Sequence, residues 1–203
     1  MEKTQLLTKE QLAVWTWLVS KGISNAMRGL SAMIGSELVV TALSVNQYSV
    51  TEASKLLGGP ENLLVGIYLT VEGDATGHLM LAHDPKMAFQ LIELQTGITA
   101  DLNSPLGEME KSVMAEMGNI TGSYFLNALA DATEMTLTHS PPAVMVDMAS
   151  AIMDVALTPI MQQQDEVLVV QTTFGTNNRQ IDGMFLVMPT MDFLTTILKR
   201  SSM

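Results

Sequence analysis

The sequence predicts an α+β fold: an internally duplicated, pseudo-twofold domain with a largely antiparallel sheet that carries two long helices and several shorter ones. The first observation is a repeat, in which proline, methionine, phenylalanine and leucine recur at the same offsets: Pro85, Met87, Phe89 and Leu94, then Pro189, Met191, Phe193 and Leu198. The second is a pair of runs with β-branched residues, 65–71 and 167–173, which is typical of strands. The third is a set of turn residues after each run, at Gly73-Asp74 and at 176–178. Hairpins that alternate with helices favour the α+β class.

Each half of the chain is predicted to hold the same elements in the same order. These are a long helix, a strand, a short helix, a hairpin and a closing helix. In the first half we expect them over 8–33, 37–48, 50–58, 63–83 and 86–96, and in the second over 105–130, 133–140, 145–158, 166–188 and 190–200. We therefore expect one domain, 1–203, made of two repeats over about 8–97 and 104–201.

The joint between the repeats carries signals for the end of one helix and the start of the next. Gly97 can end the closing helix of the first half, because glycine accepts the left-handed conformation there. Ser104 can cap the following helix, and Pro105 suits its first turn. Glu108 and Glu110 then complement the helix dipole.

The helix expected over 105–130 carries the most informative pattern. Four polar residues, spaced about one turn apart, predict a polar ridge along one face: Ser112, Glu116, Asn119 and Ser123. The core stripe is expected one position away, at Met109, Val113, Met117, Ile120 and Tyr124. Gly118 and Gly122 each cost a helix about 1 kcal/mol relative to alanine. We expect them to keep a smooth, approachable surface around the carboxylate and the carboxamide.

Composition excludes several classes of function. A hydrophobic fraction of 47% with 15% charged residues excludes a disordered chain. The net charge of -11 argues against nucleic acid as a partner, because phosphate contacts need clustered lysine and arginine. There is no cysteine, so disulfides and thiolate metal sites are absent. The apolar stretch 144–161 is interrupted by Asp147, Asp154 and Pro159, and no signal peptide begins the chain, so a cytoplasmic protein without membrane insertion is expected.

Other candidate sites are weaker. His78, His83 and His139 lack the close spacing of metal ligands, so we interpret them as ordinary surface or strand residues. Gly58 and Gly59 do not form a phosphate-binding loop, because no lysine with serine or threonine follows them.

The ridge has a wider signature. Glu116 lies four positions after Ser112, and Asn119 lies three positions after Glu116. Pro142 follows Asn119 after 22 intervening residues. This pattern, with the duplicated layout, resembles the CheC/CheX/FliY family of chemotaxis response-regulator phosphatases. The resemblance implies a hydrolase of two-component signalling that removes the phosphoryl group from an aspartate of a CheY-type receiver. It further implies that Asn119 orients the water, that Glu116 docks a lysine of the receiver, and that Mg2+ comes from the receiver. Ser112 and Pro142 match supporting positions of the signature, and the protein would hold no cofactor or metal of its own.

The first half departs from that signature. The repeat alignment places Trp17 opposite Glu116 and Ser20 opposite Asn119, so both functional groups are missing there. We therefore expect one site, in the second half, and a first-half ridge that either packs inward or binds a partner. The alternative function is a non-catalytic or weakly catalytic adaptor that binds CheD or a flagellar switch or receiver protein. A small-molecule sensor built on the duplicated sheet is a third option.

Overall fold

The computed structural model describes residues 6–99, 105–162, 164–176 and 179–201, and these form six helices and seven strands, which confirms the α+β class. The first half holds α1 (Lys9–Ile34), β1 (Leu38–Ser49), α2 (Val50–Ala53), β2 (Leu63–Gly73), β3 (Gly77–His83) and α3 (Pro85–Thr96). The second half holds α4 (Glu108–Thr133), β4 (Leu137–His139), β5 (Ala143–Met148), α5 (Ala149–Met161), β6 (Glu166–Thr176), β7 (Arg179–Pro189) and α6 (Met191–Ser201). The repeat boundary near 97 and 104 stays a prediction, since 100–104 lie outside the described residues.

All strands belong to one antiparallel sheet in which the two halves exchange partners. The order is β1-β6-β7-β3-β2-β4, and β5 also pairs with β2. Strand β1 of the first half thus pairs with the hairpin of the second half, and β4 and β5 pair with the hairpin of the first. The central β3–β7 pair joins the two hairpins. The arrangement is pseudo-twofold, as the sequence predicts.

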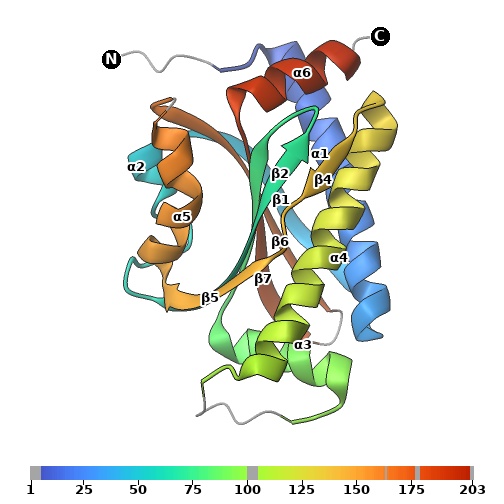
Figure 1. Cartoon of the computed structure of the whole chain (residues 1–203), viewed down its shortest axis with the longest axis vertical. Coiled ribbons are helices and arrows are strands. Elements are labelled where there is room, and N and C mark those ends of the chain that lie inside the picture. Colours follow the sequence, from blue (N-terminus) through green and yellow to red (C-terminus); the bar gives the residue numbers. More distant parts are fainter. Residues whose placement is uncertain (1–5, 100–104, 163, 177–178, 202–203) are drawn as a thin grey trace.

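Helices cover both faces of the sheet, and Figure 1 shows α1 and α4 on one side and α2 and α5 on the other. Alternating strand residues divide accordingly between two cores. In β3, Leu79 and Leu81 join the larger core under α1 and α4, while Met80 and Ala82 join the smaller core under α2 and α5. Helices α3 and α6 close the larger core through residues such as Phe89 and Phe193.

The ends of the helices follow from local sequence. Thr8 caps α1 through a reciprocal capping box with Gln11. Asp84 accepts from the backbone of Lys86 at the start of α3, and Gly97 ends that helix at φ 70°, as predicted. Helix α4 begins after Gly107, which makes no side-chain cap. The predicted cap Ser104 lies outside the described residues.

The segment 133–148 differs from prediction. Instead of a strand over 133–140 and a helix from 145, α4 continues to Thr133, and β4 and β5 occupy 137–139 and 143–148 before α5 begins at Ala149. The two strands lie where the continuous β1 lies in the first repeat, since 38 + 99 = 137 and 49 + 99 = 148. Pro141 and Pro142 interrupt the ladder, because proline has no N–H to donate.

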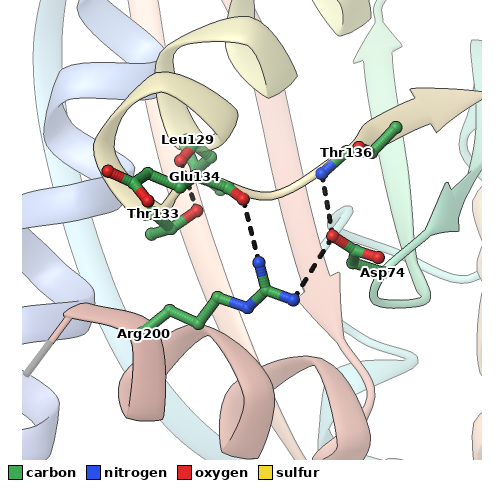
Figure 2. A network of polar contacts seen from close by, with 6 residues as sticks. All are labelled: Asp74, Leu129, Thr133, Glu134, Thr136 and Arg200. Carbon is green, nitrogen blue, oxygen red and sulfur yellow. Dashed lines mark hydrogen bonds and ion pairs between the residues drawn. The ribbon is translucent and has the colours of Figure 1, made fainter. Parts of the chain in front are cut away.

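A polar network joins the C-terminal end of α4 to two distant segments (Figure 2). Arg200 of α6 donates Nη1 to the carbonyl oxygen of Glu134 at 2.9 Å, and its Nη2 lies 3.6 Å from Asp74 Oδ2. Asp74 also accepts from the backbone of Thr136 at 3.0 Å. The guanidinium thus binds the end of α4, where the helix dipole favours positive charge.

Candidate functional site

Helix α4 presents a different face to the core from the one the sequence suggested. Of the expected stripe, Met117 is buried, Val113 and Ile120 are half-buried, and Met109 and Tyr124 are 48% and 39% exposed. The residues that α4 buries are Met114, Met117, Gly118, Thr121, Gly122, Phe125, Leu126, Leu129 and Thr133. This face repeats that of α1 at a constant offset, since 108 − 9 and 133 − 34 both equal 99. The expected stripe is therefore wrong at Met109 and Tyr124, whereas Met117 lies in the larger core and Val113 packs against it.

The polar ridge itself lies at the surface. Ser112, Glu116 and Asn119 are exposed, and Ser123 is half-buried. Because α4 is a regular helix here, Glu116 and Asn119 project one turn apart from the same side. Among the described residues, neither side chain has a hydrogen bond or ion pair. A carboxylate and a carboxamide are thus free to meet a partner from solution.

The two glycines of α4 do not form the smooth outer surface that the sequence suggested. Both are buried, and both bring the helix close to the sheet. A Cβ added to Gly118 would lie 2.5 Å from Ile67 and 3.2 Å from Pro142, and one added to Gly122 would lie 3.2 Å from His139. Pro142 therefore packs against the inner side of the turn whose outer side carries Glu116 and Asn119.

The segment that contains His139 and Pro142 is bonded to two neighbours. Ser123 Oγ lies 2.9 Å from His139 Nε2, and His139 Nδ1 lies 2.8 Å from the carbonyl oxygen of Ser140. Ser140 in turn exchanges two hydrogen bonds with the backbone of Thr70 on β2, each at 3.0 Å. The sequence places Ser123 on the ridge but gives no sign of its bond to His139, because the contact crosses from helix to strand.

The first-half ridge is exposed as well. Trp17 is 52% exposed, so the expectation that this ridge packs inward is wrong for that side chain. Lys21 places Nζ 4.0 Å from the centroid of the Trp17 ring, a cation–π geometry. Trp17, Ser20, Lys21 and Arg28 help to line a hollow of about 590 Å³ between α1 and α4, with Asp131 also in its wall.

The three histidines occupy strands. His78 is bonded to the Tyr68 hydroxyl at 2.7 Å, and burial lowers its pKa. His83 is fully buried, and burial lowers its pKa to about 4. Within the described ranges, no three histidine, aspartate or glutamate side chains gather as a metal site would require. No described helix is both long and apolar enough to cross a membrane.

Comparison with known proteins finds similarity to one protein family. Residues 109–146 match the sequence profile of the CheC-like family, and this range includes Ser112, Glu116, Asn119 and Pro142. The chain is 26% identical over 176 residues to the CheY-P phosphatase CheC of Bacillus subtilis (strain 168), covering 86% of this chain and 84% of that protein.

Solved structures share the fold. Thermotoga maritima FliY superposes with a TM-score of 0.76 at 17% identity, covering 98% of each chain. A chain of the FliG–FliM complex from H. pylori superposes with a TM-score of 0.65 at 16% identity, covering 95% of this chain and 100% of that one.

Proposed function

We propose that this chain, a member of the CheC-like family, hydrolyses the aspartyl phosphate of a CheY-type receiver, as the name of its Bacillus subtilis relative suggests. The observation that carries the proposal is the exposed pair Glu116 and Asn119, one turn apart on α4 with both side chains free among the described residues. The protein would act in the cytoplasm, where its receiver is phosphorylated.

In this proposal, Asn119 is the residue that orients the attacking water. An acyl phosphate is already reactive, so catalysis requires a water held in line with the phosphorus–oxygen bond that breaks. The Oδ1 atom of Asn119 accepts a hydrogen bond from that water, and its Nδ2 donates to the phosphoryl oxygens. As the water adds to phosphorus, the aspartate carboxylate leaves with its electron pair, and the water proton passes to solvent.

Glu116 supplies the docking contact. Its exposed carboxylate, one turn from Asn119, pairs with a lysine beside the phosphorylated aspartate and so fixes the register of the two proteins. Any Mg2+ that balances charge on the phosphoryl group belongs to the receiver. Pro142, packed against Gly118, supports the turn between the two functional residues from behind.

The test is phosphate release from a phosphorylated receiver. Asn119→Ala should slow release roughly 10²–10³-fold, the scale for removal of one preorganised polar group. Glu116→Ala should also weaken receiver binding, and the wild-type interaction should weaken as salt rises. Asn127→Ala is the matched control, because Asn127 is an exposed asparagine on the same helix, two turns further on. Equal turnover in the Asn119 variant and the control would refute the proposal.

A binding adaptor remains the second candidate, and the exposed Trp17 surface favours it. The fold likeness to a chain of the FliG–FliM complex shows that this architecture occurs in an assembly. Partners on this reading are CheD or a flagellar switch protein. Receiver binding without accelerated phosphate release would support the adaptor over the enzyme.

A further inference from the structure

A line of hydrogen bonds runs inward from the proposed site. It begins at Ser123, one turn after Asn119 on the ridge, and passes to His139 Nε2 at 2.9 Å. From His139 Nδ1 it continues to the carbonyl oxygen of Ser140 at 2.8 Å. The backbone N–H of Ser140 donates to the carbonyl oxygen of Thr70 on β2, and the Ser140 hydroxyl oxygen accepts from the backbone N–H of Thr70. The imidazole therefore stands between the helix that carries the ridge and the rigid sheet.

The direction of these bonds follows from chemistry. A carbonyl oxygen only accepts, so the proton of the neutral ring is on Nδ1, which donates to Ser140. In that neutral tautomer Nε2 carries the lone pair and accepts a hydrogen bond from the Ser123 hydroxyl, whose oxygen lies 2.9 Å away. Because its one proton is used in that bond, the Ser123 hydroxyl can only accept a hydrogen bond from any further partner.

The first repeat provides an internal comparison. The offset of 99 that relates α1 to α4 and β1 to β4 and β5 pairs Ser123 with Ser24 and His139 with Val40. Ser24 donates to the carbonyl oxygen of Ser20 in its own helix, and Val40 is 40% exposed and has no polar side-chain atom. The serine–histidine bond between helix and strand therefore occurs in the second repeat, which carries Glu116 and Asn119. The first repeat, which lacks these two residues, has no such bond between Ser24 and Val40.

We propose that His139, acting through Ser123, is a positioning residue that sets the orientation of the Asn119 carboxamide; this rests on the proposed function. A carboxamide has two nearly equivalent orientations, which exchange its oxygen and its NH2 group. In the unbound protein the Asn119 side chain makes no hydrogen bond among the described residues. When its carboxamide turns toward Ser123, one turn later on the helix, the Ser123 oxygen can accept from Nδ2 but cannot donate to Oδ1. Oδ1 is thereby directed outward, toward the attacking water.

The test combines kinetics with a direct view of the amide. Ser123→Ala and His139→Phe should each lower kcat about 10-fold, the loss expected when the Asn119 carboxamide is present but misdirected. KM should stay unchanged, because Glu116 still docks the receiver.

Ser123→Thr, which keeps a hydroxyl, and His139→Gln, which keeps an acceptor, should retain most of the activity. The double variant should be no slower than either single variant, because one chain of bonds is interrupted in each. Ser24→Ala, the repeat counterpart, should leave kcat unchanged.

The second readout is the NMR signal of the Asn119 side-chain NH2 group, which should shift in Ser123→Ala while that of Asn127 stays fixed. If Asn119→Ala slows turnover but Ser123→Ala and His139→Phe do not, this inference is overturned while the proposed function stands. The same conclusion follows if the effects of Ser123→Ala and His139→Phe are confined to KM, or if they add in the double variant. If Asn119→Ala leaves turnover unchanged, the proposed function fails and this inference fails with it.

Discussion

The buried imidazole of His83 is the clearest pH-sensitive group at the scale of single residues. It is 1% exposed, its ring lies edge-on to Phe174, and neither of its nitrogens has a hydrogen-bond partner among the described residues. Burial without a partner disfavours the charged ring, which is why its pKa falls to about 4.

Acid should therefore destabilise the fold through His83. Between pH 6.5 and about 4 the unfolded chain binds a proton at this residue and the folded chain does not, so stability is present above pH 6.5 and is lost as pH falls. The full loss is about 3 kcal/mol, from 1.36 kcal/mol per pKa unit. Denaturant unfolding of the wild type and His83→Leu across this range should show a flatter profile for the variant. His78 titrates in both proteins, so the difference isolates His83; parallel profiles would contradict the prediction.

Residue patterns predicted the ridge but not the buried face of α4. Glu116 and Asn119 could be placed from spacing alone, because residues three apart share a helix side. The core face could not, because Met109 and Tyr124 are as apolar as the residues that are in fact buried, while Thr121 is buried and satisfies its hydroxyl at the Met117 carbonyl oxygen. The sequence pattern alone predicts that Gly118 lies at the surface, because its close contact with Ile67 and Pro142 can be recognised only in the folded structure.

At the scale of elements, the end of α4 carries a strained residue. Glu134 adopts φ 52° and ψ 35°, the left-handed conformation, whereas the equivalent cap of α1 is Gly35 at φ 65°. Such a conformation costs a residue with a Cβ roughly 1–2 kcal/mol. In Figure 2 the Glu134 carboxylate points away from Arg200, whose bond is to the backbone carbonyl oxygen.

Glu134→Gly should accordingly stabilise the protein by about 0.5–1 kcal/mol, after the greater freedom of glycine in the unfolded chain is subtracted. Glu134→Ala is the matched comparison, because it removes the same charge from the helix C-terminus but keeps the Cβ and the strain. Thermal or denaturant unfolding should rank the glycine variant above the alanine variant. An alanine variant of equal stability would show that charge, and not backbone strain, limits this cap.

The internal repeat predicts the strands over 137–148 better than the local apolar pattern does. Most helices and the two hairpins were predicted within a few residues of their observed bounds, because caps and turns mark their ends locally. The sequence pattern predicts a helix for residues 145–148, because an apolar run has no strand signature of its own. Copying β1 forward by 99 residues would have indicated the interrupted strand at 137–148.

At the scale of the whole molecule, the two ridges differ in chemistry although they share a backbone. Where the second half has Glu116, Ile120 and Asn127, the first has Trp17, Lys21 and Arg28. Duplication thus gives two helices of equal length whose exposed sides differ in charge, which suits two different partners better than two copies of one.

The corresponding prediction uses paired double variants. Trp17→Ala with Ser20→Ala should leave phosphate release from the receiver nearly unchanged, because neither side chain can replace a carboxylate or a carboxamide. Glu116→Ala with Asn119→Ala should abolish acceleration in a protein that remains folded by circular dichroism, since both side chains are exposed. Loss of activity in the folded first-half variant would mean that the catalytic surface is not confined to the second half.

The exchange of strand partners has a consequence for the order of synthesis. Ser49 of β1 pairs with Glu166 and Leu38 pairs with Thr176, so the partners are separated by 166 − 49 = 117 to 176 − 38 = 138 residues. At about 5–20 residues per second, a ribosome makes the missing strand roughly 6–28 s after β1 itself. During that interval the nascent chain presents an unpaired strand of 12 residues. A stalled or truncated product of the first half would keep that edge open, and chaperones that bind extended segments are its natural first partners.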